Sequence, residues 1–590
     1  MIFISRRTAE GEQARPRRKV GCLGGCLIFF IVYFISVALI RWMMGDVFSS
    51  SSVKLEDQTV YRLQLKGELV EQAQEQNPLA DLMGSVPYSS YVKNETVGLD
   101  DILANIRLAK NDDKILGIWL DGAEMSMAPA SAKAIRDALL DFKTGGKWII
   151  ASAKHYGQTN YYVASVADRI CVDPTGTVSW NGLSATKMYF TRALEKIGVE
   201  MQILKVGTFK SAVEPYFRTS MSEADRKQTE EYLNGIWSEY KSAVSASRHL
   251  SEAQLEKLAD RCMALQSPEA QVEAGLADTI VYAQDMDSLL RIYTGTKDYK
   301  MLSTSMLAQV ERPKSKAEDK VAVLYLEGAI TDEEGDGIVG TEVVKTLKKI
   351  KKDDDVKALV LRVNSPGGSA DASEQIWHAI QKIKADSIPV VVSMGDYAAS
   401  GGYYISCGAD YIYAEPTTLT GSIGIFGTIP NYNKIRNKLG LDIDGVKTNK
   451  FSDLDANIVF NGMNNEEYKL LQGMVERGYD LFTSRCAEGR HVSQDYIKSI
   501  GEGRVWLGFK GKELGIVDEL GNLDDAIAKA VELAGLESYR LTYYPEKQDP
   551  WEELLKAFDN TTDEERLIMK VREFCSKPRI MALMPEVEIK

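Results

Sequence analysis

The first pattern along the chain is an unbroken apolar segment near the N-terminus. Residues 20–40 read VGCLGGCLIFFIVYFISVALI and contain no charged side chain. A helix rises about 1.5 Å per residue, so this segment matches the ~30 Å hydrocarbon core of a bilayer. Residues 14–19 (ARPRRK) are strongly basic, and only Arg41 closely follows the segment. Because basic flanks stay in the cytoplasm, we expect an uncleaved transmembrane anchor, with residues 1–19 cytoplasmic and the remainder extracytoplasmic.

The rest of the chain alternates short apolar runs with segments of helical period. Residues 321–326 and 358–363 are rich in β-branched side chains, and between them residues 343–350 carry apolar side chains at helical spacing. Residues 388–392 (IPVVV) are continuously apolar, which indicates a strand buried on both faces. The pattern predicts an α/β fold with mainly parallel sheets covered by helices.

This pattern occurs twice. Residues 97–120 (VGLDDILANIRLAKNDDKILGIWL) resemble residues 339–362 (VGTEVVKTLKKIKKDDDVKALVLR) at an offset of 242, and Asp168 and Asp410 keep the same offset. A constant offset over so many positions predicts a tandem duplication of one domain.

The duplication defines the expected domain boundaries. We predict an N-terminal repeat domain over residues 56–300, a polar linker over 301–318, a C-terminal repeat domain over 319–545 and a helical tail over 546–590. A chain of 590 residues also exceeds the roughly 250–300 residues that one hydrophobic core holds.

Charge and cysteine content remove several classes of function. The formal net charge is −13, and the basic residues cluster only before the apolar segment, so nucleic acid is not an expected partner. The seven cysteines form no set with zinc-ligand spacing in the soluble part. We therefore expect no structural zinc site.

The two copies differ where chemistry is expected. In the second copy, residues 364–368 (NSPGG) follow one strand and residues 398–402 (AASGG) follow the next. In the first copy, Gln158 falls opposite Ser400. Only the second copy therefore carries a candidate serine nucleophile.

The glycines beside this serine suggest acyl-transfer chemistry. Taken singly, Ser400 is compatible with a helix N-cap and the Gly367-Gly368 pair with a tight turn. Together, a strand, a glycine pair, and a serine that opens a helix predict an oxyanion hole made by the N–H groups of Gly368 and Gly401.

A serine nucleophile needs a base. The four histidines are His155, His249, His378 and His491. None lies in a motif that places it near Ser400, although spacing alone leaves a Ser-His-Asp triad open. A lysine whose pKa burial lowers from about 10.4 is the alternative base.

Four motifs carry a resemblance to a known family. Residues 365–369 (SPGGS), 393–404 (SMGDYAASGGYY), 419–427 (LTGSIGIFG) and 206–215 (VGTFKSAVEP) resemble the signal peptide peptidase A family in its long, two-domain form. The resemblance implies tandem domains like those of the Clp protease and crotonase superfamily. It also implies a homotetramer on the outer face of the bacterial cytoplasmic membrane that cleaves remnant signal peptides without metal or cofactor.

The resemblance also assigns roles to residues. It implies that Ser400 is the nucleophile, that Lys210 is the general base, and that Ser422 orients the lysine amine. Lys450 ends a similar sequence, VKTNK, in the second copy. Nearby Asp453 would hold an ammonium group protonated, so Lys210 is the preferred base.

Two functions of other classes are also compatible with the sequence. A crotonase-like acyl-CoA enzyme would use the same oxyanion glycines without a serine and lysine pair. A non-enzymatic scaffold that binds peptides or membrane partners would need neither. Labelling of Ser400 by a fluorophosphonate distinguishes the protease from both.

Overall fold

The computed structural model describes residues 53–73, 96–310, 312, 315–546 and 579–583. One compact unit, Leu55–Ala308 with Arg312–Lys590, contains all of the described helices and strands. The predicted cytoplasmic segment and anchor lie outside the described residues. Among the described residues, no helix has the length and apolar character needed to cross a membrane.

The first repeat forms a seven-stranded parallel sheet. Its strand order is β2-β1-β3-β4-β5-β7, with β8 also paired to β1, and every pairing is parallel. The strands are β1 (Thr59–Val70), β2 (Thr96–Gly98), β3 (Ile115–Ser126), β4 (Trp148–Tyr156), β5 (Arg169–Val178), β7 (Thr279–Ile280) and β8 (Lys300–Ser303). The helices around it include α3 (Leu99–Asn111), α4 (Pro129–Lys143) and α5 (Gln158–Ala164).

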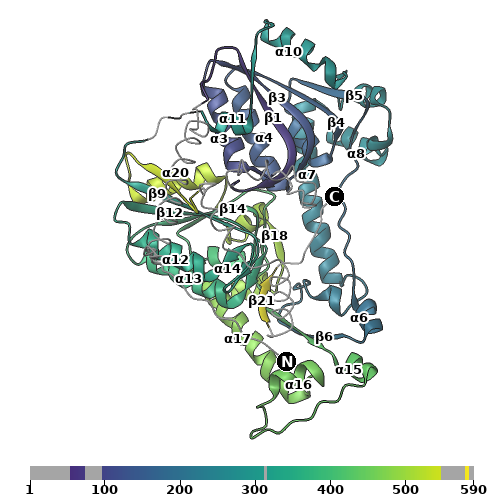
Figure 1. Cartoon of the computed structure of the whole chain (residues 1–590), viewed down its shortest axis with the longest axis vertical. Coiled ribbons are helices and arrows are strands. Elements are labelled where there is room, and N and C mark those ends of the chain that lie inside the picture. The colour runs from purple at the N-terminus through teal and green to yellow at the C-terminus, as the bar shows by residue number, and fades with distance from the viewer. Residues whose placement is uncertain (1–52, 74–95, 311, 313–314, 547–578, 584–590) are drawn as a thin grey trace, which may run out of the picture. The chain divides into compact units, whose positions relative to one another are not determined.

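The second repeat forms an eight-stranded sheet of the same design. Its order is β18-β16-β14-β12-β9-β20, with β15 joining β14 to β19, and only β16 and β18 pair antiparallel. The strands are β9 (Lys320–Glu327), β12 (Val356–Ser365), β14 (Val390–Ala399), β15 (Tyr411–Ala414), β16 (Leu419–Gly421), β18 (Val505–Leu507), β19 (Glu519–Leu520) and β20 (Arg540–Tyr544). The prediction of mainly parallel α/β sheets is therefore confirmed in both copies (Figure 1).

Burial explains why these segments form the centre of each sheet. In β12 almost every residue is buried, and α12 (Gly340–Lys351) and α13 (Ala370–Lys384) cover one face with apolar side chains at helical spacing. On the other face, α20 (Leu523–Ala534) packs Ala526 and Ala530 against the strands. Continuous apolar runs are thus the expected signature of a sheet covered on both sides.

Long helices follow the repeat offset. In the first repeat α7 spans Glu223–Arg248, and in the second α17 spans Asn465–Arg490. Each begins with a polar N-cap, Ser222 or Asn464, whose side chain accepts a backbone N–H. The duplication therefore extends beyond the sheets.

A third, six-stranded sheet joins the two repeats. Its order is β11-β10-β13-β21-β17-β6. The strands are β6 (Glu200–Lys205), β10 (Ile330–Thr331), β11 (Ile338–Val339), β13 (Gly367–Ser369), β17 (Phe426–Asn431) and β21 (Arg579–Leu583). Because β6 comes from the first repeat and β17 from the second, this sheet brings the loop after β6 against the second repeat. At 579–583 the tail is a strand, where the sequence pattern predicts a helix.

Candidate active site

Ser400 lies at a tight turn between β14 and α14 (Gly401–Ser406). Its backbone has φ 57° and ψ −114°, an uncommon conformation for a residue with a side chain, and its N–H donates to the Gly421 carbonyl at 2.8 Å. The side chain is fully buried and makes no capping hydrogen bond to its own helix. The N-cap interpretation of this serine therefore fails, and its hydroxyl is directed to another partner.

Gly401 is required by the close approach of the neighbouring loop. A Cβ built on Gly401 would lie 2.8 Å from the Ser373 Oγ and 3.1 Å from the Gly368 nitrogen. No side chain fits in that space. The two glycines predicted as oxyanion donors are therefore beside each other and next to Ser400.

Lys210 meets Ser400 although 190 residues separate them in sequence. Its Nζ lies 2.7 Å from Ser400 Oγ and 3.1 Å from both the hydroxyl and the carbonyl oxygen of Ser422, within hydrogen-bond distance of all three. Lys210 is fully buried, and no carboxylate forms an ion pair with it in the described part of the chain. Burial holds the pKa of Lys210 well below its ordinary value, which favours the neutral amine.

Ser422 is held in place from both sides. Its backbone N–H donates to the Arg504 carbonyl at 2.7 Å, and its hydroxyl donates to the Gly503 carbonyl at 3.3 Å. The hydroxyl oxygen is thus left to accept from Lys210. Gly503 also packs against the lysine, since a Cβ on it would lie 2.6 Å from Lys210 Cβ. The amine therefore has one fixed approach to Ser400.

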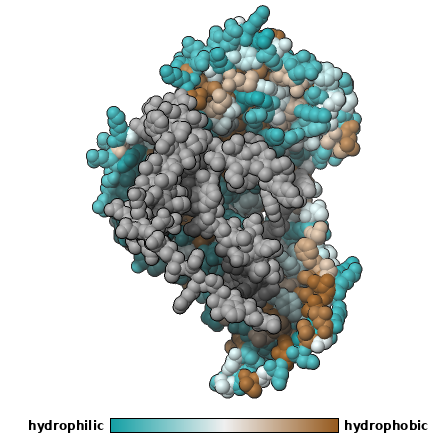
Figure 2. Space-filling model, viewed as in Figure 1, coloured by the Kyte–Doolittle hydropathy of each residue, from teal (hydrophilic) through white to brown (hydrophobic). Residues whose placement is uncertain are grey.

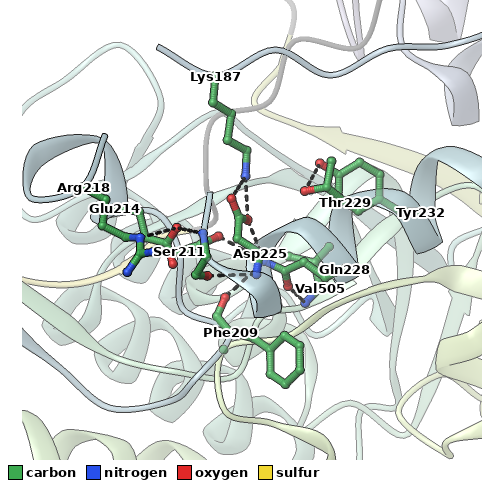
Figure 3. A network of polar contacts seen from close by, with 12 residues as sticks. Lys187, Phe209, Ser211, Glu214, Arg218, Asp225, Gln228, Thr229, Tyr232 and Val505 are labelled. Atoms are coloured by element: carbon green, nitrogen blue, oxygen red, sulfur yellow. Dashed lines mark hydrogen bonds and ion pairs between the residues drawn. The ribbon is translucent and has the colours of Figure 1, made fainter. Parts of the chain in front are cut away.

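The loop that carries Lys210 is anchored by α7 (Figure 3). The Gln228 amide donates to the Phe209 carbonyl at 3.2 Å and to Ser211 Oγ at 3.0 Å, while its oxygen accepts the Val505 N–H. Gln228 thus ties the residues on both sides of Lys210 to the second repeat. The sequence pattern gave no indication of this role, because a glutamine in a long helix usually faces solvent.

A buried ion pair supports the same anchor. Lys187 Nζ lies 2.6 Å and 2.7 Å from the two carboxylate oxygens of Asp225, and both side chains are buried (Figure 3). Asp225 also accepts from Gln228 at 3.1 Å. Two charges that are buried away from water must be fully paired to be tolerated. The pair therefore gives the loop that carries Lys210 a rigid support.

Polar contacts between the repeats reach the strand before Ser400. Glu71 of the first repeat forms a two-point ion pair with Arg362, at 2.8 Å and 3.1 Å. Ser131, also of the first repeat, donates its N–H and its hydroxyl to Asp396 in β14 at 2.8 Å and 2.5 Å. Because Asp396 precedes Ser400 by four residues, the first repeat both carries Lys210 and contacts the strand that leads to Ser400.

At the position of the first repeat that corresponds to Ser400, the Gln158 side chain is engaged in hydrogen bonds. The Gln158 side-chain oxygen accepts the N–H groups of Asn181 and Gly182, and its amide donates to the Gly182 carbonyl at 3.0 Å. No hydroxyl or thiol replaces it there. At the position that the repeat offset pairs with Ser400, the first repeat therefore has a hydrogen-bonded glutamine.

The alternative bases lie elsewhere. The Lys450 side chain is 65% exposed and forms an ion pair with Glu466. All four histidines are exposed, and none of them hydrogen-bonds to Ser400. Lys210 is therefore the basic group that the structure brings to the serine. Within the described residues, no cluster of histidine, cysteine, aspartate and glutamate has the arrangement of a metal site.

Comparison with known proteins agrees with this geometry. The sequence model of peptidase family S49 matches residues 141–294 and 382–537, one segment in each repeat. The chain belongs to peptidase family S49. It is accordingly a serine protease, and a Clp protease model also matches residues 314–418. These matches favour the protease over the acyl-CoA enzyme and the scaffold that the sequence left open.

Similar proteins cover most of this S49 peptidase. Protease 4 of Salmonella typhi is 34% identical over 534 residues, which cover 88% of this chain and 85% of the relative. Protease 4 of Haemophilus influenzae is 34% identical over 544 residues, covering 87% and 86%. The chloroplastic serine protease SPPA of Arabidopsis thaliana is 28% identical over 455 residues, covering 75% and 67%. The similarity thus includes both repeats.

Proposed function

We propose that this S49 peptidase is a membrane-anchored endopeptidase that degrades cleaved signal peptides and other short or unfolded peptides by a Ser/Lys dyad. The observation that carries the proposal is the 2.7 Å contact between Lys210 Nζ and Ser400 Oγ in a fully buried position. A buried lysine without a carboxylate partner is suited to accept a proton at neutral pH.

The reaction follows from these positions. Neutral Lys210 takes the hydroxyl proton of Ser400 as Oγ bonds to the peptide carbonyl carbon, and the carbonyl oxygen becomes an oxyanion. The N–H groups of Gly368 and Gly401 stabilise that oxyanion. The protonated lysine then gives its proton to the departing amine, and the C–N bond breaks to leave an acyl-enzyme. A water molecule, deprotonated by the same lysine, hydrolyses the ester and restores Ser400.

Ser422 acts on the base in this scheme. Its hydroxyl accepts one N–H of Lys210 at 3.1 Å, and its carbonyl oxygen accepts from the same amine at 3.1 Å. With these N–H groups engaged, the nitrogen lone pair of the neutral amine is directed to the Ser400 hydroxyl. Orientation of a base in this way increases the fraction of reactive geometries.

The duplication acquires a functional explanation. Lys210 belongs to the first repeat and Ser400 to the second, so neither repeat alone has a complete dyad. Their contact crosses the third sheet, in which β6 of the first repeat pairs with β17 of the second. The first repeat has Gln158 in place of the serine and supplies the base.

Attachment to the membrane rests on the sequence. Residues 20–40 have the length and apolar character of a transmembrane helix, and the basic residues precede them. We therefore place residues 1–19 in the cytoplasm and both repeats outside the bacterial cytoplasmic membrane. Remnant signal peptides are released at the same membrane, and a relative from Enterococcus faecium, 35% identical over 214 residues, is named a putative signal peptide peptidase SppA.

Two segments whose equivalents pair in the third sheet are themselves unpaired, and this supports assembly into a homotetramer. Within one chain β6 pairs with β17, and at the repeat offset of 242 their counterparts are residues 442–447 and 184–189. Neither counterpart forms a strand, and residues 442–447 are all exposed. If the next copy repeats the first contact, residues 442–447 of one chain pair with residues 184–189 of another. Such head-to-tail contacts form a ring of four copies if each contact rotates the next copy by a quarter turn.

The helices beside these segments differ in the same way: one repeat has a contact that its counterpart in the other repeat lacks. In α6 (Thr191–Ile197) the chain turns at Gly198, whose carbonyl accepts the N–H of Ile435 in α15 (Asn433–Leu439) at 3.0 Å. The equivalent Gly440 at the end of α15 has no atom within 4 Å of a Cβ built on it. Apolar surface gathers in the region of α6, and Leu439, Leu441 and Ile443 are exposed (Figure 2). A second copy would cover them.

Peptide turnover tests the proposed function. Purified full-length protein in detergent should hydrolyse a synthetic signal peptide, with products identified by mass spectrometry. Ser400→Ala should reduce kcat by more than about 10⁴-fold while the oligomer size and thermal midpoint stay unchanged. An acyl-CoA thioester supplied under the same conditions serves as the control for crotonase-like chemistry. Full peptide hydrolysis by Ser400→Ala would exclude the dyad.

A further inference from the structure

A turn of the second repeat, residues 502–504, contacts the loop of the first repeat that carries Lys210. The first of its three carbonyl groups accepts the N–H of Phe209 at 2.9 Å, and Phe209 directly precedes Lys210. The second and third accept from the hydroxyl and the N–H of Ser422, at 3.3 Å and 2.7 Å. One turn therefore holds both the residue before the base and the residue that orients it.

The side chain of Arg504, the last residue of this turn, contacts the same loop. Its guanidinium carbon lies 4.7 Å from the ring centre of Phe209 and 4.0 Å from that of Trp506. The guanidinium also forms an ion pair with Glu231 of α7, but Glu231 is 45% exposed, and exposed ion pairs contribute little to structure. A guanidinium over an aromatic ring is a directional contact. Arg504 therefore holds the loop chiefly through the Phe209 ring.

This contact bears on the position of the lysine amine. Phe209 and Lys210 are adjacent, so a movement of the Phe209 ring also moves the backbone from which the lysine side chain extends. A base must lie within about 2.6–3.2 Å of the proton donor, and Lys210 Nζ lies 2.7 Å from Ser400 Oγ. A small displacement of the loop is enough to lengthen this contact beyond the reactive range.

Arg504 and Gln228 hold the loop through different groups. Gln228 donates to the Phe209 carbonyl at 3.2 Å and to the Ser211 hydroxyl at 3.0 Å, and so fixes the backbone and a neighbouring side chain (Figure 3). Arg504 contacts the Phe209 ring. Loss of Arg504 would therefore loosen the loop and leave its hydrogen bonds to Gln228 in place.

We propose that Arg504 is a positioning residue, which holds Phe209 from the second repeat and so keeps Lys210 within reach of the nucleophile. This inference deepens the proposed Ser/Lys mechanism and rests on it. Arg504 acts through Phe209 on the base, and through its own carbonyl group on Ser422. It joins the two repeats at the point where the groups of the dyad meet.

The expected effect is on kcat. A base that samples several geometries spends less time in the reactive one, so the rate falls in proportion. Because the Gln228 hydrogen bonds remain, we expect a loss of about tenfold, smaller than the 10²–10⁴-fold loss on removal of a general base. Arg504 contributes no group to the proposed oxyanion hole, and KM should stay within about twofold of the wild type.

Peptide hydrolysis by the full-length protein in detergent compares variants of both partners with the wild type. Arg504→Met keeps the length of the side chain and removes the planar cation, and Phe209→Leu removes the ring on the other side of the contact. Arg62→Met is the matched control. Arg62 likewise lies over a ring, that of Trp119 at 4.9 Å, and donates to Asp121 at 2.6 Å, and both of these partners belong to β3 of the first repeat.

We expect kcat to fall about tenfold in Arg504→Met and in Phe209→Leu, with Arg62→Met equal to the wild type. The double variant Arg504→Met/Phe209→Leu should also lose about tenfold, because both changes break one contact. Losses that multiply to about a hundredfold, or an unchanged kcat in either single variant, overturn the proposal. If Arg504→Met fails to fold, Phe209→Leu decides, since it keeps the ion pair between Arg504 and Glu231.

Hydrogen exchange separates this inference from the proposed mechanism. The Phe209 N–H bonds to the turn at 2.9 Å, and its exchange rate should increase at least about threefold in Arg504→Met and stay unchanged in Arg62→Met. Faster exchange, together with full hydrolysis by Lys210→Ala, would support the hold on the loop and contradict the dyad. Exchange at the wild-type rate, together with hydrolysis that requires Lys210, would support the dyad and overturn the positioning role.

Discussion

Replacement of Lys210 by methionine tests whether the amine is neutral in the folded protein. Methionine has a similar length and no charge, and the site around Lys210 contains no carboxylate that the change would leave unpaired. The substitution removes hydrogen bonds to the hydroxyls of Ser400 and Ser422, at a cost of about 1 kcal/mol each. It also removes the need to bury an amine.

The pKa of Lys210 determines how the free energy of unfolding changes with pH. Burial lowers the pKa of folded Lys210 well below the ordinary value of 10.5 that applies when the chain is unfolded. Between these two pKa values the unfolded chain binds one more proton than the folded chain, so the free energy of unfolding of the wild type rises with pH. The slope is about 1.4 kcal/mol per pH unit, and it ends at the unfolded pKa. Lys210→Met has no such term.

Urea denaturation at pH 7, 8 and 9 measures the difference. Relative to the wild type, Lys210→Met should lose about 1.4 kcal/mol of stability with each pH unit above the folded pKa. Lys450→Met is the matched control, because its side chain is exposed and paired with Glu466, and its difference from the wild type should not change with pH. If the Lys210→Met difference is also constant from pH 7 to 9, the amine is protonated in the folded protein and cannot act as the base.

Further predictions concern kinetics, stability and topology. Lys450→Ala should leave kcat/KM unchanged, whereas Lys210→Ala should lower it about 10²–10⁴-fold; steady-state peptide assays that show the reverse would make Lys450 the base. Ser422→Ala removes one hydrogen bond to the amine and should lower kcat about fivefold to tenfold with KM unchanged; a pure KM effect would contradict an orienting role. Burial and the nearby Glu71 raise the pKa of Glu327 from 4.5 to about 7, so the folded state binds the extra proton and loses up to about 3 kcal/mol of stability as pH rises through this range. Glu327→Gln should therefore be more stable than the wild type at pH 8 and equal at pH 4 in urea titrations, and a constant difference would refute the assignment. Protease added to spheroplasts should digest both repeats, and protection until lysis would show the proposed orientation to be wrong.

Periodicity predicted the parts of the fold that depend on local sequence. The run before the SPGG motif became the buried centre of the second sheet as β12, because a strand covered on both faces has no polar position to interrupt it. The constant offset of 242 found the duplicated domain, and also placed Gln158 at the closed site of the first repeat. These features need no knowledge of distant contacts.

The remaining features depend on contacts between distant segments. Nothing in the periodic pattern joins Lys210 to Ser400 across 190 residues, and only the family motifs indicated the pair. Arg362 and Glu71 resemble solvated charges in the sequence, but they form a buried ion pair between the repeats. β21 is a strand because it pairs with the edges of β13 and β17, which are more than 150 residues away in sequence. A short segment adopts the conformation that such neighbours require.

Fluorophosphonate labelling tests the central claim most directly. The full-length wild type and Lys210→Ala are treated at pH 8, and the modified residue is located by peptide mapping with mass spectrometry. A Ser400 nucleophile activated by Lys210 predicts a single adduct on Ser400 in the wild type and a labelling rate about 10²–10⁴-fold lower in Lys210→Ala. An adduct on another residue, or Ser400 labelling that proceeds at the same rate without Lys210, would contradict the dyad.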